Sequence, residues 1–204
     1  MTRPLFLAVA GALLALGFAA CGPTDPQTRR SAGAAASDQA TPMTVSDFSA
    51  ADADLSAWHI QNDGVMGGRS EGHMRLADGA LAFDGTLVTE GGGFSSVLRE
   101  GALDLSGAAA VEVLARGDGR RYDFALHDGS RDRGREVWWR APFTPGEDFA
   151  AHRVAFADLR ATAHGEPLPG AQLDLSSVAL AGFYIIDGRD GPFRLEVREV
   201  RAVE

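Results

Sequence analysis

Short runs of alternating apolar and polar residues fill the chain from Val45 onward. An apolar residue at every second position is typical of a β-strand with one buried side and one solvent-facing side. Turns that contain Gly, Asp or Pro separate the runs, and helical spacing of apolar residues is nearly absent. The pattern predicts strands at Trp58–Gln61, Gly72–Leu76, Ala80–Leu87, Phe94–Arg99, Ala110–Ala115, Arg121–His127, Glu136–Pro142, Ala151–Ala157, Val178–Ile186 and Phe193–Val203.

These strands predict an all-β fold. In residues 122–127, Tyr122, Phe124 and Leu126 point to the same side, and in residues 193–198 apolar residues alternate with charges. One side of each strand is therefore expected to be dry. The segment 77–80 predicts a hairpin turn at Asp78-Gly79, and residues 158–174 are expected to be the longest irregular connection. We expect a single jelly-roll β-sandwich over residues 44–204.

The first 20 residues do not follow this pattern. Arg3 is followed by an uncharged apolar run, and small residues precede Cys21, which is the only cysteine. This composition predicts a secretory signal peptide over residues 1–20. The segment 18–21 resembles the lipobox of bacterial lipoproteins, with Phe18 where Leu is usual, and predicts lipidation of Cys21. Cleavage near Ala20 that releases an unlipidated protein is the alternative.

Residues 21–43 are expected to form a lipidated cysteine and a flexible linker. They are mostly small and polar and have no periodic apolar face that could be buried. Gly22, rather than Asp, follows the cysteine, and by resemblance to bacterial sorting rules this favours the outer membrane. The expected location is the cell envelope, where a lipid anchor holds the domain on the periplasmic side.

The formal net charge of −9 limits the classes of partner. Nucleic acids and anionic membrane surfaces bind clustered cations, which release counterions on contact. The chain has no such basic run. We therefore expect no nucleic-acid partner, and contact with the membrane only through the lipid.

The most unusual stretch is the loop at residues 62–70, which follows the strand at Trp58–Gln61. It holds three glycines and the pair Asn62-Asp63, whose side chains can accept hydrogen bonds from nearby backbone. Such a tightly specified connection between strands is either a rigid corner or a binding site.

One motif suggests catalysis. The segment Gly68-Arg69-Ser70-Glu71-Gly72 matches the G-x-S-x-G pattern of hydrolases, which places a serine on a turn between a strand and a helix. Here a strand is predicted to follow, and no alternation of strands and helices surrounds the motif. A serine hydrolase is therefore disfavoured, and no catalytic residue is predicted.

Metal sites are also disfavoured. The histidines lack the spacing that presents two imidazoles to one metal ion; His73 and His127 are expected at solvated outward positions, and only His59 lies beside the loop. The turn at residues 187–191 offers two carboxylates, whereas calcium needs six or more oxygen ligands. No metal and no cofactor are predicted.

Trp138 and Trp139 must lie on opposite sides of a strand, so one is expected in the core and the other at the surface. An exposed indole could stack on a sugar or contact a protein partner, and Arg135 and Arg140 nearby could bind hydroxyl or carboxylate groups. The tripeptide Arg116-Gly117-Asp118 matches an adhesion motif, but its continuation into a strand favours coincidence.

Five sequence blocks, in order, resemble the complex I intermediate-associated protein 30 family. They are residues 58–70, 83–85, 92–99, 116–122 and 191–195. The resemblance implies a galactose-binding-like jelly roll and, for mitochondrial members, a non-catalytic role in assembling respiratory complex I. By the same resemblance, the binding residues are Asn62, Asp63, Met66, Arg69, Ser70, Phe94, Arg99, Arg116, Asp118, Arg121 and Tyr122.

The function expected from the sequence is a non-enzymatic binding domain of an envelope lipoprotein. Its partner would be an envelope protein, such as a respiratory-complex component. An export signal places this chain on the side of the membrane opposite to that of the mitochondrial members. The alternative is a carbohydrate-binding module that contacts a glycan through Trp138 or Trp139.

Overall fold

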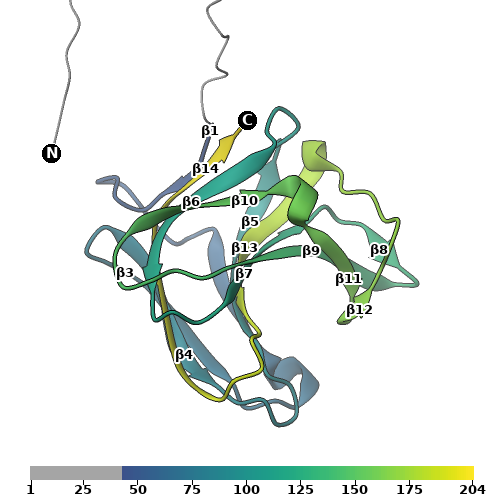
Figure 1. The fold of residues 1–204 in the computed structure, drawn as a ribbon, viewed down its shortest axis with the longest axis horizontal. Coiled ribbons are helices and arrows are strands. Elements are labelled where there is room, and N and C mark those ends of the chain that lie inside the picture. Colours follow the sequence, from purple (N-terminus) through teal and green to yellow (C-terminus); the bar gives the residue numbers. More distant parts are fainter. Residues whose placement is uncertain (1–42) are drawn as a thin grey trace, which may run out of the picture. The chain divides into compact units, whose positions relative to one another are not determined.

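The computed structural model describes residues 43–204 (Figure 1). The predicted signal peptide, Cys21 and nearly all of the linker lie outside the described residues. Within residues 43–204, no helix has the length and apolar character that a membrane crossing requires.

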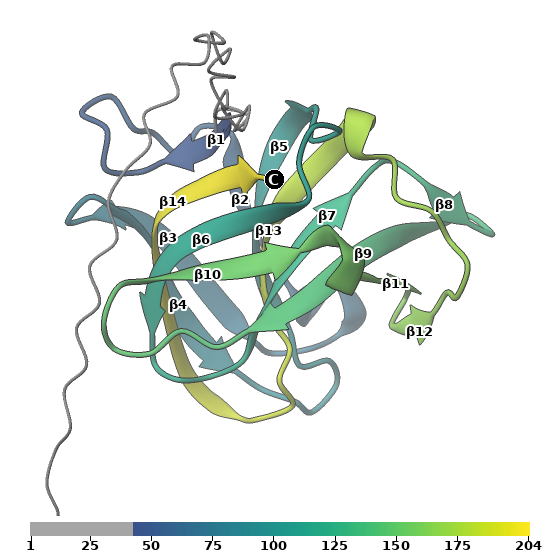
Figure 2. The same cartoon turned by 45° about the horizontal axis from the view of Figure 1, so that its top comes forward.

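Two antiparallel sheets form a sandwich (Figures 1 and 2). Sheet A has the order β10 (Ala150–Ala155), β6 (Ala110–Gly117), β14 (Gly191–Val203), β4 (Ala80–Leu87) and β3 (Glu71–Ala77), and β1 (Met43–Asp47) also pairs with β14. Sheet B has the order β12 (Glu166–Pro167), β11 (Arg160–Ala163), β9 (Arg135–Phe143), β7 (Tyr122–His127), β13 (Val178–Ile185), β5 (Ser95–Leu103) and β2 (Trp58–Asn62), and β8 (Arg131–Asp132) pairs with β9. Short 3-10 helices are η1 (Asp63–Met66), η2 (Phe156–Asp158) and η3 (Leu175–Ser177).

All ten predicted strands are confirmed, with small shifts at their ends. The hairpin between β3 and β4 is also confirmed: Ala77 pairs with Ala80, and Asp78 and Gly79 have φ angles of 53° and 69°. The prediction for residues 158–174 was wrong in part, because β11 and β12 lie there. Both are short and pair at the edge of sheet B, so their sequences carry little alternation.

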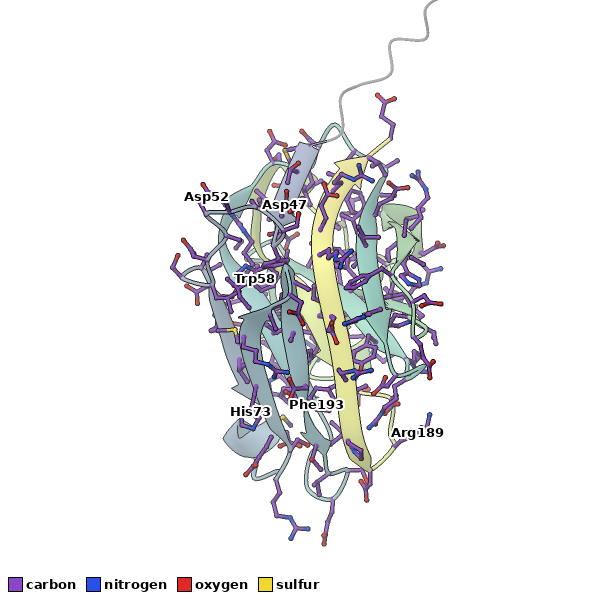
Figure 3. The ribbon with its side chains drawn as sticks, turned by 90° about the vertical axis from the view of Figure 1, so that its left-hand side faces the viewer. Asp47, Asp52, Trp58, His73, Arg189 and Phe193 are labelled. Atoms are coloured by element: carbon purple, nitrogen blue, oxygen red, sulfur yellow. The ribbon has the colours of Figure 1, made fainter. Side chains whose placement is uncertain are left out.

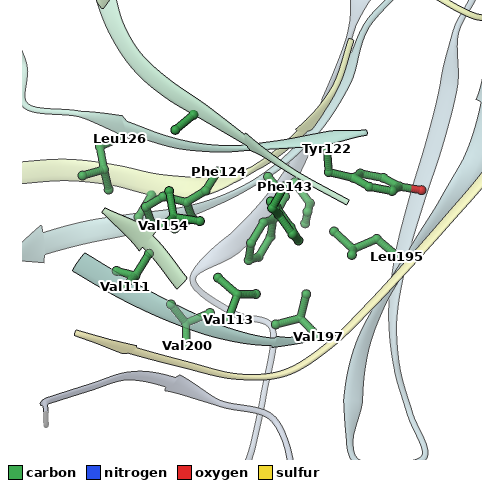
Figure 4. Close-up of a cluster of buried hydrophobic side chains, with 14 of the residues drawn as sticks. Val111, Val113, Tyr122, Phe124, Leu126, Phe143, Val154, Leu195, Val197 and Val200 are labelled. Atoms are coloured by element: carbon green, nitrogen blue, oxygen red, sulfur yellow. The ribbon is translucent and has the colours of Figure 1, made fainter. Parts of the chain in front are cut away.

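The core lies between the two sheets, as the alternation predicts. From sheet B, Tyr122, Phe124 and Leu126 on β7 point inward, and residues of β6, β10 and β14 face them from sheet A (Figure 4). Phe124 and Phe183 pack edge to face, with ring centroids 5.9 Å apart. Burial of these apolar side chains is the main force that holds the sheets together.

The two ends of the sandwich differ. The start of β1 and the end of β14 lie together at one end, because Met43 pairs with Ala202. The loop that contains η1 lies at the opposite end, as Figure 3 shows, where the start of β3 also lies. The loop predicted to be a rigid corner or a site is therefore remote from the ends of the described domain.

Candidate functional site

A second, smaller group of apolar side chains lies on the outer face of sheet B. It consists of Leu98, Ala125 and Tyr184, with Phe94, Trp138 and Ile186 packed against them. The alternation of the strands puts these residues outside: on β9 Trp139 enters the core and Trp138 faces outward, and on β13 Phe183 enters the core and Tyr184 faces outward. Apolar residues on both faces of one sheet indicate a surface built for contact.

Aromatic rings run across this outer face. His127 stacks on Trp138 with ring centroids 5.1 Å apart, and Trp138 meets Tyr184 edge to face at 5.4 Å. Phe94 lies beyond Tyr184, at 6.1 Å. The rings come from β7, β9 and β13 and from the residue before β5, so the sheet itself sets their spacing.

A cleft of about 540 Å³ opens over these rings, and we call it the aromatic cleft. The loop at residues 62–70 forms one wall through Met66, whose exposed fraction is 61%. The hairpin of β8 and β9 forms the opposite wall. The lining residues are Gln61, Met66, Gly92, Phe94, Arg131, Gly134, Arg135, Glu136, Trp138, Arg140, His164, Gly165, Tyr184 and Ile186.

The polar groups of the cleft are planar and held by neighbours. The Nη2 of Arg140 donates a hydrogen bond of 3.1 Å to the Oγ1 of Thr162 on β11, and its guanidinium lies 5.5 Å from the centre of the Tyr184 ring. Arg131 pairs with Glu136 at 3.3 Å, and Arg135 pairs with Asp132 at 3.1 Å.

Burial shifts the pKa of two groups on this face. It raises the pKa of Tyr184 to about 12, so the phenol is neutral at pH 7. Burial also raises the pKa of Asp123, which lies opposite Tyr184 on β7, although Arg140 and Arg121 act against this shift. The cleft therefore offers a neutral phenol and a guanidinium side by side.

Asp63 holds the loop wall in place. Its carboxylate accepts hydrogen bonds from the backbone N–H of Ser70 (2.9 Å), Gly93 (2.7 Å) and Phe94 (3.4 Å), and from the Ser70 hydroxyl (2.7 Å). Burial raises the pKa of Asp63, but these hydrogen bonds outweigh it and the net pKa is lowered. One carboxylate thus ties the loop at residues 62–70 to the segment that carries Phe94.

Two glycines are required by this arrangement. A Cβ at Gly68 would lie 2.2 Å from the Asp63 carboxyl carbon, and one at Gly92 would lie 2.7 Å from the Asp63 Cβ. Both positions therefore need glycine for close approach. The neighbouring Asn62 side chain accepts hydrogen bonds from Ser95 and from the Gly72 backbone, at 2.6 and 3.1 Å.

Ser70 is fully engaged in this network. Its exposed fraction is 4%, its hydroxyl donates to Asp63, and the N–H of Val88 donates to it at 3.0 Å. A serine nucleophile needs a base and access to substrate. The structure instead buries Ser70 against the Asp63 carboxylate, where it helps to hold the loop at residues 62–70 in place.

The structure divides the residues suggested by resemblance into three groups. Met66 and Phe94 line the aromatic cleft together with Trp138, whereas Asn62, Asp63 and Ser70 lie behind its wall. Arg69 pairs with exposed Glu90, and Arg99 bonds the Gly101 carbonyl. The other four residues of this set, like Arg69 and Arg99, lie outside the cleft and complete the third group.

Arg116, Asp118, Arg121 and Tyr122 are not part of the cleft. Arg116 lies on sheet A, where it binds Glu196 at 2.6 Å and packs over the Phe149 ring at 4.8 Å. Tyr122 is buried in the core, and its hydroxyl lies 3.1 Å from Asp118. Arg121 is exposed.

One histidine prediction was wrong. His127 does face outward, but its exposed fraction is 6%, because Trp138 covers it and its Nδ1 lies 2.8 Å from the Val137 carbonyl. His73 is exposed, as expected, and His59 lies 3.2 Å from Glu100. His164 lines the cleft, which no sequence signal indicated.

The acidic turn at residues 187–191 has a structural use. Asp187 pairs with buried Arg120 at 2.6 Å, and Asp190 accepts a hydrogen bond of 2.7 Å from the Thr89 backbone. In the part of the chain that the structure describes, no three His, Cys, Asp or Glu side chains gather in a way that could hold a metal ion.

Sequence reasoning missed Tyr184, Gln61 and Glu136 in the cleft, whereas Arg135 and Arg140 were named as groups that could bind hydroxyls or carboxylates and do line it. Tyr184 could have been found, since it is an aromatic residue at an outward position of a predicted strand. The others depend on which strands are neighbours, and β9, β7, β13 and β5 lie side by side only in the folded sheet.

Solved structures with the same fold include carbohydrate-binding modules. The family 11 carbohydrate-binding module of the cellulosomal cellulase Lic26A-Cel5E of Clostridium thermocellum has 14% sequence identity and a TM-score of 0.59, over 80% of this chain and 95% of that chain. The Clostridium thermocellum family 11 module in complex with a β-1,3-1,4-mixed-linked tetrasaccharide has 15% identity and a TM-score of 0.58, over 79% and 95%. The agarase AgWH50C has 14% identity and a TM-score of 0.53, over 80% of this chain and 24% of that chain.

At these identities the likeness concerns the fold, which is an all-β sandwich with jelly-roll neighbours. No individually curated protein sequence matches the chain. The family model of complex I intermediate-associated protein 30 matches residues 46–197, which is most of the chain and includes the loop, both walls of the cleft and the core strands. The chain therefore belongs to the complex I intermediate-associated protein 30 family.

Proposed function

We propose that this chain is a non-catalytic binding domain of an exported, lipid-anchored envelope protein, and that the aromatic cleft is its ligand site. The observation that carries the proposal is the row of rings at the floor of a concave surface, made by Trp138, Tyr184 and Phe94. The volume of about 540 Å³ falls within the usual range of small-ligand sites.

The ligand that this geometry supports best is a saccharide. Proteins hold sugars by placing flat aromatic faces against the apolar side of the ring and planar polar groups against its hydroxyls. The cleft offers the partly exposed Trp138 for the first contact, with the largely buried Tyr184 ring beside it, and Arg140, Glu136 and Gln61 for the second. The fold likeness to carbohydrate-binding modules agrees with this interpretation.

Binding of purified protein to an array of cell-wall and storage polysaccharides tests the saccharide. We expect binding that Trp138→Ala reduces by up to about tenfold, because one stacked aromatic contact contributes about 0.5–1.5 kcal/mol. Arg153→Ala is the matched control, since Arg153 is exposed on β10 of the other sheet. An array with no signal for any saccharide would refute this ligand.

A protein partner is the second candidate, and family membership favours it. In this version the cleft receives a loop of an envelope protein, and Met66 at its rim supplies an adaptable apolar contact. A component of respiratory complex I would be accessible to an exported chain only on the outward surface of the membrane arm.

Photo-crosslinking in intact cells tests the protein partner. A photoreactive residue replaces Met66 at the cleft rim and, as a control, Leu76, which is also exposed but lies on β3 of sheet A. We expect one envelope protein to be captured from position 66 and not from position 76. Equal capture from both positions would count against a partner in the cleft.

A further inference from the structure

We propose that the ligand of the aromatic cleft carries a carboxylate, that Arg140 binds this carboxylate, and that the ligand is an acidic saccharide. The inference rests on the proposed saccharide-binding function and adds the charge of the ligand. The charged side chains that line the cleft, and the ion pairs that they form, support it.

The cleft has an excess of cations in a chain that is otherwise acidic. The formal net charge is −9, yet the lining includes Arg131, Arg135 and Arg140 against a single carboxylate, that of Glu136. A concave surface with an excess of one sign concentrates ligands of the opposite sign. An arginine of the cleft that has no carboxylate partner is therefore the favoured contact for an anionic ligand.

Two of the three arginines are neutralised within their own hairpin. Arg131 pairs with Glu136, and Arg135 pairs with Asp132. Arg140 forms no ion pair with any carboxylate in residues 43–204, and its one side-chain hydrogen bond goes to the Thr162 hydroxyl. A guanidinium carries five N–H donors, so most of those of Arg140 are left for a ligand.

Arg140 is also held in position before any ligand arrives. The side chain is half-buried, the Thr162 hydroxyl holds one edge of the guanidinium, and the Tyr184 ring lies 5.5 Å away. A planar guanidinium binds a carboxylate through two parallel hydrogen bonds, and a side chain that is already ordered loses little entropy on binding.

Asp123 is a carboxylic acid of the protein itself that interacts with the positive charge of Arg140. It lies on the adjacent strand β7 and faces the same side of the sheet, and Arg140 acts on its pKa through space. The two side chains do not form an ion pair or a hydrogen bond with each other among the described residues. Asp123 therefore weakens the positive potential around Arg140 without occupying its donors.

The rings beside Arg140 favour a saccharide over a peptide carboxylate. Trp138 and Tyr184 form a corner at 69°, in which the guanidinium lies over the buried Tyr184 ring and Trp138 remains partly exposed. An aspartate or glutamate side chain would satisfy Arg140 but leave this corner uncovered. A pyranose ring with a carboxyl substituent, such as a uronic acid or a muramic acid, can occupy both.

Calorimetric titration of the mature protein with matched saccharides tests the inference. The probes are an oligogalacturonate, its fully methyl-esterified form, a neutral galactooligosaccharide of equal length, and a peptide-free glycan from bacterial cell wall whose muramic acid residues carry free carboxylates, together with the methyl ester of that glycan. Methyl esterification removes the charge and keeps the ring, so it isolates the carboxylate. The two acidic probes distinguish a uronic-acid polymer from cell-wall glycan.

We expect at least one acidic probe to bind about tenfold or more tightly than its uncharged counterpart, because hydrogen bonds to charged groups exceed those to neutral ones. Arg140→Gln should remove this preference, so that the acidic probe and its uncharged counterpart bind with affinities within about twofold of each other. Arg153→Gln is the control for loss of surface charge. Added salt should weaken only the acidic probe.

Two outcomes would overturn the inference while the proposed function stands. One is equal binding of acidic and uncharged saccharides, and the other is an Arg140→Gln variant that keeps its preference for the acid. Failure of every saccharide to bind would overturn both. Capture of a protein segment by the cleft, with no saccharide bound, would also overturn both and would favour the second candidate function.

Discussion

At the scale of single residues, Asp63 does the most to shape the candidate site. Its buried carboxylate takes hydrogen bonds from Ser70 on one side and from Gly93 and Phe94 on the other. An ionised group can be buried at low cost only when such donors surround it. Phe94 reaches the cleft because this carboxylate fixes the backbone just before it.

Replacement of Asp63 by Asn tests this role. The amide cannot accept hydrogen bonds from all these donors, so the free energy of unfolding at pH 7 should fall by about 2–3 kcal/mol. The folded pKa of Asp63 lies below its ordinary value of 3.8, so its stabilisation is full above that value and is lost as pH falls through the lower folded pKa.

Urea unfolding between pH 2 and pH 7 measures both effects. The gap between wild type and the Asn variant should be largest near pH 7 and should narrow below about pH 4. A gap that is constant across this range would show that the charge of Asp63 is unimportant.

The glycines that cover Asp63 give a second prediction. Gly68→Ala places a Cβ against the carboxylate and should lower the free energy of unfolding by about 1–3 kcal/mol, since overpacking forces the loop to shift. Gly64→Ala, in the same loop, meets no atom within 4 Å and should change it by less than about 0.5 kcal/mol. Thermal unfolding of both variants checks the contrast, and equal losses would contradict it.

At the scale of elements, the buried pair Arg120–Asp187 joins two turns. Arg120 lies between β6 and β7, and Asp187 follows β13; the guanidinium also donates to the Gly191 and Pro192 carbonyls at 3.0 and 2.8 Å. Both side chains are at most 6% exposed. Loss of one partner leaves the other buried without its charge partner.

Arg120→Ala should therefore lower the free energy of unfolding by about 3–5 kcal/mol. Its neighbour Arg121 is exposed, so Arg121→Ala serves as the matched control and should cost less than about 0.5 kcal/mol. Denaturant unfolding of Arg120→Ala, of Asp187→Ala and of the double variant gives the coupling energy of the pair. A coupling energy near zero would show that the ion pair between Arg120 and Asp187 does not stabilise the fold.

The elements also show how much of the fold the sequence could predict. Every strand with at least five residues of alternating pattern between clear turns was predictable, as residues 80–87 and 191–203 illustrate. β1 and β11 were not, because they are short strands near sheet edges whose pairing is decided by β14 and β9 and not by their own residues.

The candidate site was less predictable than the fold, for the same reason. The loop at residues 62–70 and Trp138 were identified from turn chemistry and alternation. Their meeting in one cleft depends on long-range strand order, and so does the burial of His127 beneath Trp138. A local pattern specifies which side of a strand a residue faces, but not which side chain lies beside it.

At the scale of the whole molecule, the two outer faces are built differently. The face of sheet A carries ion pairs that cross neighbouring strands, between Arg116 and Glu196 and between Arg201 and Glu112. The face of sheet B carries the aromatic cleft. Partly exposed ion pairs contribute little stability, so the sheet A face keeps the domain soluble without strengthening it much.

Arg116→Gln tests this division of roles. We expect a loss of less than about 1 kcal/mol in the free energy of unfolding, because the pair with Glu196 is partly exposed. Saccharide affinity should stay within about twofold of wild type, since Arg116 lies on the other sheet. A large loss of binding with an intact fold would instead assign the ligand surface to sheet A.

The position of the loop opposite to both ends of the described domain has a consequence for reach. If the chain is anchored through Cys21, as we propose, the linker joins the domain at the start of β1, so the corner built on Asp63 lies at the end farthest from the point of attachment. A flexible linker leaves the domain free to turn, but the cleft wall can then extend farther from the membrane than the attached end can. An attachment at the corner itself would instead hold this wall close to the membrane.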